Sequence, residues 1–266
     1  MSQVVLFSKK QSHIDFASFI ARELNKNLLI ENEIENLNKE NINIVPDYLS
    51  LHQNVSEDSI ILDTGSIIKP KFSTLVCNVD SAKTSDYENF LLHLDLLKFS
   101  KVQEILIKNS TDKYSVVNFF KDILVSEDIN KQILTDILQV LDETIMNAIF
   151  DAQKLNIPRS TSFELERPVK VEWALEKSMF YFKVIDQWGS LDKEKVFNHL
   201  NQNLEEYQID HSYHGAGLGL YRSFFIAGAS MKFQCIPNKN TSVSCLFKLK
   251  KKNRDFKKQL KFFSVN

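Results

Sequence analysis

The sequence contains little cysteine, proline or glycine: three, five and six residues, respectively, of 266. The cysteines, Cys77, Cys235 and Cys245, have neither the spacing of a metal-binding motif nor that of a disulfide framework, which excludes a small cystine-stabilised fold. Cys235 and Cys245 could meet across a hairpin, but reduced thiols in a cytoplasmic protein are the expectation.

Long hydrophobic runs and an excess of charge of either sign are also missing. No apolar run approaches the roughly 20 residues that span a bilayer, and the first apolar stretch precedes its lysines, the reverse of a signal peptide. Lys and Arg number 33 against 34 Asp and Glu, so neither nucleic acid nor anionic lipid is an expected partner. The hydrophobic share of 43% suits a folded protein with one large domain or two ordinary ones.

The few glycines are concentrated in one part of the chain. Four of the six, Gly189, Gly215, Gly217 and Gly219, lie between positions 189 and 219. Glycine is required where φ is positive or where a ligand contacts the backbone. A chain that concentrates its glycines in this way is expected to use them for one loop.

The first half of the chain alternates short apolar segments with helical patterns. Strands are expected at residues 4–7, 60–62, 75–79 and 105–107, and helices at 13–24, 87–98 and 115–124. This alternation predicts a small parallel α/β domain over residues 1–125.

The pattern changes at about residue 126. Helices are expected at 129–154 and 192–204, strands at 169–175 and 179–185, then a glycine loop that opens a helix, and a closing hairpin of 231–236 with 243–249. This order predicts an α+β domain over residues 126–250, with helices on one face of a mostly antiparallel sheet. The basic tail, 251–266, is expected to be a frayed helix; a partner-docking helix and weak anionic-surface binding are the alternatives.

Three groups of residues have the chemistry of a ligand site. Glu143, Asn147 and Asp151 follow one another at i, i+4 and i+8 on the long helix, where oxygen-bearing side chains could hold hydrated Mg²⁺; a solvated helix face has the same pattern. Asp186 ends a buried strand, where it could accept a hydrogen bond from an exocyclic amine or act as a cap. The Gly215–Gly219 loop precedes a helix, an arrangement suited to phosphates.

Taken together and in this order, these motifs over about 130–250 resemble the GHKL (Bergerat) ATPase family, which implies a two-layer α+β sandwich that binds ATP and Mg²⁺. The resemblance makes Asn147 the metal ligand and Glu143 the general base. It makes Asp186 the partner of the adenine amine, with Thr241 supporting it through water.

The resemblance also assigns residues to the phosphates. Gly215, Gly217 and Gly219, with Leu218 between them, would hold the phosphates, and residues 205–214 would form the ATP lid, where His214 could contact them. Gly189 belongs to the adenine-binding motif.

Two positions depart from the family pattern. Trp188 stands where the first glycine after the aspartate is usual, so Gly189 is displaced by one. Trp188 could stack on the base or narrow the pocket. Asp151 stands where histidine or lysine is common, and its charge would repel phosphates unless a metal ion or water intervenes.

Within the family, the helix motif is most similar to that of anti-sigma-factor serine kinases, which phosphorylate a small antagonist protein. A small regulatory protein is therefore the implied partner, and homodimers are common among such relatives. A non-catalytic nucleotide-sensing protein and the ATPase half of a split histidine kinase are the alternatives. For the latter, His13 and His93 each precede a hydrophobic–acidic pair, but both lie in the α/β pattern.

The first half resembles a degenerate receiver domain in its order of strands and helices. Asp63 follows an apolar strand, where a receiver keeps its phosphoacceptor, and Lys108 follows the last strand, where it keeps its lysine. Ser8, Lys9 and Lys10 replace the acidic pair that would bind Mg²⁺. The resemblance therefore implies a module for protein contact.

Overall fold

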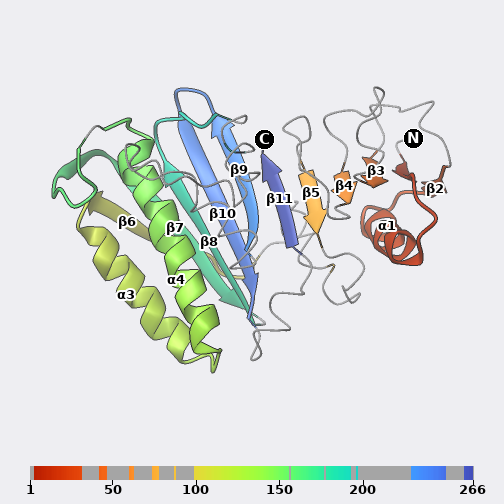
Figure 1. Cartoon of the computed structure of the whole chain (residues 1–266), viewed down its shortest axis with the longest axis horizontal. Coiled ribbons are helices and arrows are strands. Elements are labelled where there is room, and N and C mark those ends of the chain that lie inside the picture. Colours follow the sequence, from red (N-terminus) through yellow and green to blue (C-terminus); the bar gives the residue numbers. More distant parts are fainter. Residues whose placement is uncertain are drawn as a thin grey trace, which may run out of the picture. The chain divides into compact units, whose positions relative to one another are not determined.

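The computed structural model describes residues 3–31, 42–46, 60–62, 74–77, 87, 99–155, 157–176, 178–192, 196, 229–249 and 261–265. The structure is mixed α/β, as predicted, and its contacts divide it into two compact units (Figure 1). The first unit comprises Met1–Leu97 with Lys258–Val265, and the second comprises Lys98–Lys257. None of the described helices is both long and apolar enough to span a bilayer.

The first unit is built on a mixed sheet. Its strands, in spatial order, are β2 (Leu28–Ile30), β1 (Val4–Leu6), β3 (Ile42–Pro46), β4 (Ile60–Leu62), β5 (Thr74–Cys77) and β11 (Lys261–Val265). The first five are parallel to one another, and β11 runs antiparallel to β5. The order 2-1-3-4-5 is that of the flavodoxin-like doubly wound sheets.

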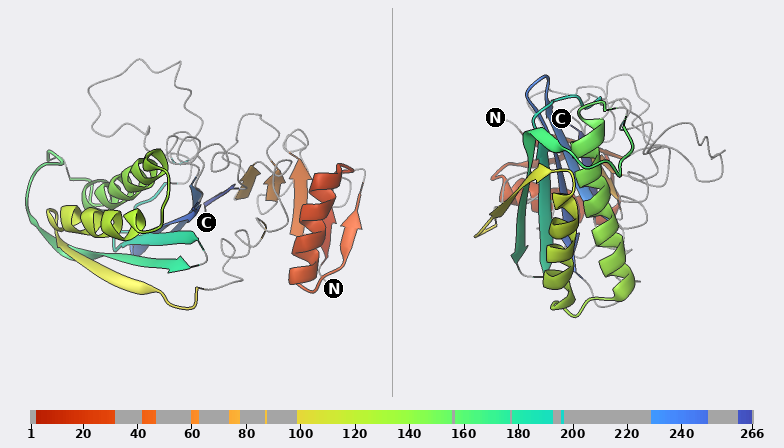
Figure 2. Two further views of the ribbon diagram at one scale, coloured as in Figure 1. Left: turned by 90° about the horizontal axis from the view of Figure 1, so that it is seen from below. Right: turned by 90° about the vertical axis from the view of Figure 1, so that its left-hand side faces the viewer.

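Helix α1 (Gln11–Glu23) supplies most of the described helical packing of this unit. It lies against β1, as Figure 2 shows, and buries Phe16, Ala17 and Ile20 completely. The ring of Tyr87 packs edge-on against Phe16, with centroids 5.3 Å apart. This apolar face at helical spacing is the one that the sequence predicted for residues 13–24.

The second unit is a two-layer arrangement. Its strands, in spatial order, are β9 (Ser230–Ile236), β10 (Asn240–Lys248), β8 (Met179–Asp186), β7 (Glu164–Glu176) and β6 (Gln103–Asn109), and all neighbours are antiparallel. Helices α3 (Asp112–Val125) and α4 (Lys131–Met146) lie side by side on one face of this sheet (Figures 1 and 2). A π-helical segment, η4 (Asn147–Asp151), continues α4.

The core of the second unit lies between the helices and the sheet. Along β7, Val169, Val171 and Trp173 are buried, as the alternating pattern predicted. Among the residues that the structure describes in this unit, the fully buried phenylalanines come from both layers: Phe120, Phe150, Phe180, Phe182 and Phe247. Burial of each contributes roughly 1.5–3 kcal/mol, so this core holds α3 and α4 firmly on the sheet.

The division between the units differs from the expected boundary at residue 125. Strand β6, expected in the first domain, pairs with β7 in the second, where Ile105 lies opposite Val171. Helix α3 packs on α4, and its Phe120 contacts Trp173 with ring centroids 5.4 Å apart. The prediction that Lys108 follows the last strand of the receiver-like domain is therefore wrong, because this residue lies within β6 of the other unit.

The C-terminal segment also differs from expectation. Residues 261–265 form β11 rather than a frayed helix, and Phe262 lies opposite Val76 of β5. Aromatic and β-branched residues favour strands, and pairing covers the edge that β5 would otherwise expose. Cys235 and Cys245 are free thiols, and the register of the hairpin sets them opposite Thr241 and Met231 rather than each other.

Candidate functional site

The predicted site residues that the structure describes lie on the long helix, at and just after the end of β8, and near the start of β10. Glu143 lies on α4, and Gly189 follows β8. Asn147 begins η4, Asp186 ends β8 and Thr241 lies near the start of β10. Strand β8 contacts η4, and the Ser190 hydroxyl donates a hydrogen bond to the Ala152 carbonyl at 2.9 Å. The segment that follows β8 is thereby attached to the end of the long helix.

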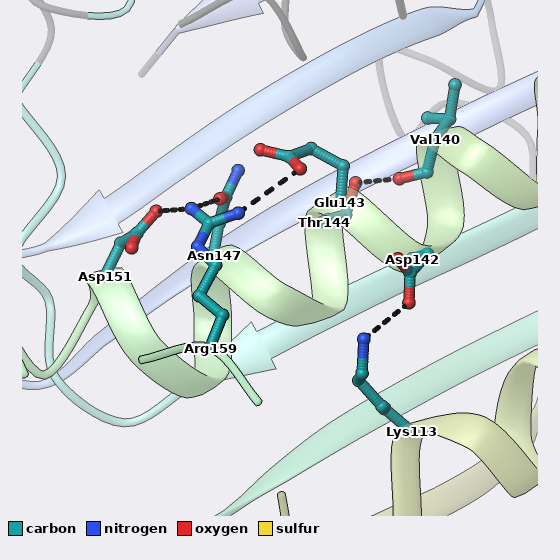
Figure 3. A network of polar contacts seen from close by, with 8 residues as sticks. All are labelled: Lys113, Val140, Asp142, Glu143, Thr144, Asn147, Asp151 and Arg159. Atoms are coloured by element: carbon teal, nitrogen blue, oxygen red, sulfur yellow. Dashed lines mark hydrogen bonds and ion pairs between the residues drawn. The ribbon is translucent and has the colours of Figure 1, made fainter. Parts of the chain in front are cut away.

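Arg159, which belongs to none of the sequence motifs, contacts the acidic side chains along the long helix (Figure 3). Arg159 Nη1 donates to Glu143 Oε2 at 3.4 Å, while Nη2 donates to Asn147 Oδ1 at 3.2 Å and to Asp151 Oδ2 at 2.6 Å. Because one guanidinium reaches all three side chains, they share one face, as their spacing predicted. Sequence spacing offered no signal for Arg159, since it belongs to a loop.

Burial governs the electrostatics of this line. Desolvation raises the pKa of the Glu143 carboxyl above its usual value, and the positive charge of Arg159 opposes that rise. Desolvation likewise raises the pKa of Asp151, again against the charge and hydrogen bond of Arg159. Burial therefore favours the neutral forms of both carboxyl groups, and a nearby cation favours their charged forms.

The helix is widened where these residues lie. The N–H of Ala152 donates to the carbonyl of Asn147 at 2.9 Å, a five-residue step in place of the usual four. Such π-helical turns insert an extra residue and are frequent at functional sites. This wide turn spans Asn147 to Asp151 and follows the regular α-helix of α4.

Asp186 is a buried carboxylate, with 5% of its surface exposed. Its Oδ1 accepts the backbone N–H of Trp188 at 2.8 Å, and Thr241 lies directly opposite it in the β8–β10 register. Burial raises its pKa, while the backbone N–H groups of Trp188, Gly189 and Thr241 act in the opposite direction. The Thr241 hydroxyl also lowers the pKa of the Asp186 carboxyl, although the two groups do not have the distance and angles of a hydrogen bond.

Thr241 therefore carries an unsatisfied polar atom beside the buried carboxylate. The residue is 4% exposed, and its Oγ1 is buried with no hydrogen-bond partner. An unpaired buried hydroxyl costs about 1–3 kcal/mol, so such atoms need an explanation. A ligand or a water molecule that bridges to a ligand would supply the missing partner.

Gly189 is explained by packing. Its φ is +62°, and a Cβ added there would lie 2.2 Å from Ile236 O and 2.7 Å from the amide nitrogens of Asn238 and Lys239. The Asn238 N–H also donates to the Gly189 carbonyl at 3.2 Å. The sequence associated this glycine with the ligand, whereas its described neighbours are the turn between β9 and β10.

Trp188 has one ring face covered. The guanidinium carbon of Arg167 lies 4.7 Å from the ring centroid, and Arg167 Nη1 donates to the Gln187 carbonyl at 2.8 Å. The indole Nε1 is buried and has no hydrogen-bond partner. Stacking of a base on Trp188 is therefore restricted to the opposite face.

No protein-family model matches the chain, and no curated protein matches it.

The remaining predicted residues of the site lie outside the described residues, as does Asp63: they are His214, Gly215, Gly217, Leu218 and Gly219.

Replacement of Thr241 by valine tests the unsatisfied hydroxyl. Valine keeps the shape and removes the unpaired oxygen, so we expect the free energy of unfolding to stay constant or rise by up to about 1 kcal/mol. Thr144→Val is the matched control, because the Thr144 hydroxyl is also buried but donates to the Val140 carbonyl at 2.7 Å. That control should lose about 1 kcal/mol in urea unfolding. Equal losses in both variants would show that Thr241 is satisfied.

Proposed function

We propose that the second unit binds ATP with Mg²⁺ and that the protein is a protein kinase of the anti-sigma type, a member of the GHKL family with a Bergerat-like ATP-binding fold. The observation that supports this most is the pairing of Asp186 with Thr241: a buried carboxylate beside an unsatisfied buried hydroxyl. A carboxylate accepts a hydrogen bond from an exocyclic amine, and the hydroxyl can bind a bridging water. An adenine supplies partners for both.

The chemistry of the helix line fits Mg²⁺. Asn147 offers an amide oxygen, flanked by the carboxylates of Glu143 and Asp151, and Mg²⁺ prefers oxygen ligands while keeping most of its waters. These oxygens already hold one cation, the guanidinium of Arg159, which supports a site suited to positive charge. Asn147 would hold the ion, which when bound would neutralise phosphate charge.

Glu143 is suited to accept a proton. Burial raises the pKa of its carboxyl, which makes the carboxylate a stronger base than a solvated glutamate. In the proposed reaction it takes the proton of a serine or threonine hydroxyl on a small regulatory protein as that oxygen attacks the γ-phosphorus. The bond between the γ-phosphorus and the β–γ bridging oxygen breaks, and ADP leaves. The first unit, with its flavodoxin-like sheet, would serve as the contact module of this cytoplasmic protein, which we expect to act alone or as a homodimer.

One observation favours a second function. Arg159 pairs with the proposed base and donates to the proposed metal ligand, so both are occupied in this structure. A protein that binds ATP and signals through the resulting change, without phosphoryl transfer, would tolerate this pairing. Binding and turnover must therefore be measured separately.

Calorimetric titration of the full chain with a non-hydrolysable ATP analogue, with and without Mg²⁺, tests binding. We expect saturable binding that Mg²⁺ strengthens, with Asn147→Ala losing the effect of Mg²⁺. Asn118→Ala, an exposed asparagine on α3, is the matched control and should bind as the wild type does. No binding at millimolar analogue would contradict the proposal.

Glu143→Gln separates the kinase from the non-catalytic protein. We expect ATP turnover to fall at least about 100-fold, because a positioned general base contributes on that scale, while analogue affinity stays within a few-fold. Glu127→Gln, which changes an exposed glutamate after α3, should leave both unchanged. Equal loss of turnover and affinity would remove Glu143 as the base. Binding without any wild-type turnover would favour the second function.

A further inference from the structure

The three contacts of Arg159 are unequal in length. The bond to Asp151 is short, at 2.6 Å, whereas those to Asn147 and Glu143 are 3.2 and 3.4 Å. Charge-assisted hydrogen bonds in the range of 2.7–2.9 Å are strong, and strength declines with distance. Asp151 is therefore the anchor of the guanidinium, and the other two contacts are the weaker ones.

The loop that carries Arg159 is closed by a turn and held on the C-terminal side of that turn by Ser110. The N–H of Thr161 donates to the Pro158 carbonyl at 2.9 Å, which closes a turn around Arg159. The Ser110 hydroxyl donates to the Thr161 carbonyl at 2.9 Å and accepts the Phe163 N–H at 3.1 Å. These hydrogen bonds fix the backbone position from which the Arg159 side chain reaches Glu143, Asn147 and Asp151.

The guanidinium retains unused donors. Arginine has five N–H groups, and those of Nη2 serve Asn147 and Asp151, while Nη1 makes the single long bond to Glu143. The side chain is 22% exposed, and its Nε is buried without a partner. Nη1 is therefore the nitrogen best able to donate a hydrogen bond to an anion, and the planar guanidinium matches the geometry of phosphate oxygens.

We propose that Arg159, anchored by Asp151, binds the phosphates of the nucleotide at the site described above; this inference rests on the proposed ATP binding. The Asp151 carboxylate then holds the positive charge of Arg159 beside the phosphates, and that charge offsets the repulsion that Asp151 alone would cause. The anchor at Asp151 stays in place, while phosphate oxygens replace the long contacts to Glu143 and Asn147. That exchange frees the Glu143 carboxylate and the Asn147 amide oxygen for their own roles.

Calorimetry with three probes, the non-hydrolysable ATP analogue, ADP and adenosine, tests this assignment in the full chain with Mg²⁺. Arg159→Gln should weaken analogue binding at least tenfold and adenosine binding less than twofold, and Arg159→Lys should recover part of the loss. Asp151→Asn should weaken analogue binding about threefold or more, because it releases the anchor. Arg22→Gln, which breaks the exposed Arg22–Glu23 pair of the first unit, is the matched control and should bind as the wild type does.

The outcomes separate this inference from the proposed function. Wild-type binding of all three probes with no effect of Arg159→Gln would overturn the role of Arg159 and leave ATP binding intact. Tighter analogue binding by Asp151→Asn would overturn the anchor, since it would mean that Asp151 repels the phosphates. A wild-type protein that binds none of the probes would overturn both. A thermal melt of each variant, with Arg159→Lys as the conservative change, distinguishes lost contacts from lost folding.

Discussion

Replacing Gly189 by alanine is expected to destabilise the second unit by at least about 3 kcal/mol, because two independent penalties combine. A residue with a Cβ costs roughly 1–2 kcal/mol at a left-handed φ, and Gly189 has φ +62°. The new Cβ would also lie 2.2 Å from Ile236 O, a backbone atom of the β9 end that cannot rotate away as a side chain does. The hairpin turn must therefore move.

Urea unfolding of the variant and the wild type measures this effect. Ser190→Ala is the neighbouring control: it removes one hydrogen bond to the Ala152 carbonyl and should cost about 1 kcal/mol. If Gly189→Ala lost no more than that control, the turn between β9 and β10 would have room to shift, and the packing explanation of Gly189 would be wrong.

Four strands of the second unit, β7, β8, β9 and β10, were predictable because each has a one-sided or buried pattern. Val169, Val171 and Trp173 alternate with other residues, and the run before Asp186 is apolar except for Lys183, so both strands were predicted. Strand β7 begins at Glu164 rather than at residue 169, and β8 ends one residue later than expected. The hairpin of β9 and β10 surrounds a turn, Pro237–Asn240, with typical turn residues. Local pattern and tertiary environment agree in these segments.

The boundary between the units was not predictable from local pattern. Strand β6 has only Ile107 fully buried, so its sequence does not show which sheet it joins. Its pairing with β7 is a contact between residues far apart in the chain, as Gln103 opposite Trp173 illustrates. Strands β2 and β3 were missed for a related reason: they are short, and β3 begins after a stretch rich in asparagine and glutamate.

The candidate site was predicted in part for similar reasons. Glu143, Asn147 and Asp151 are related by helical spacing, which sequence reveals. Arg159 reaches them from a loop, and the orientation of a loop side chain depends on tertiary contacts such as those of Ser110. The π-helical turn at Asn147 likewise leaves no mark in the spacing of apolar residues.

Asp186→Asn is expected to remove most nucleotide affinity. The change replaces a buried charged acceptor by a neutral amide, and loss of a hydrogen bond to a charged group costs on the order of 1–3 kcal/mol, or about 5- to 150-fold in affinity. Calorimetry with the ATP analogue and with adenosine measures it, and both ligands should lose affinity equally because the contact is to the base. Asp136→Asn changes another buried carboxylate of the same unit, one that accepts from Gln132, and should bind as the wild type does. Unchanged affinity in Asp186→Asn would place the base elsewhere.

The same substitution should weaken nucleotide binding but raise the stability of the fold relative to the wild type as the pH increases. Burial raises the pKa of Asp186 in the folded protein, so between its unfolded value, near 4, and that higher value the folded state binds more protons than the unfolded state. The contribution of this carboxyl to the free energy of unfolding is then fully present below about pH 4, and it is lost as the pH rises through the pKa of the folded state. Asp186→Asn cannot lose it, so its stability relative to the wild type should increase from pH 4 toward neutral pH in urea unfolding. A difference that is independent of pH would contradict the cause assigned to the raised pKa. These two results together would show that Asp186 lowers stability at neutral pH and is needed for nucleotide binding. A purely structural carboxylate would not give this combination, so the two measurements together distinguish the ligand-binding role from a structural one.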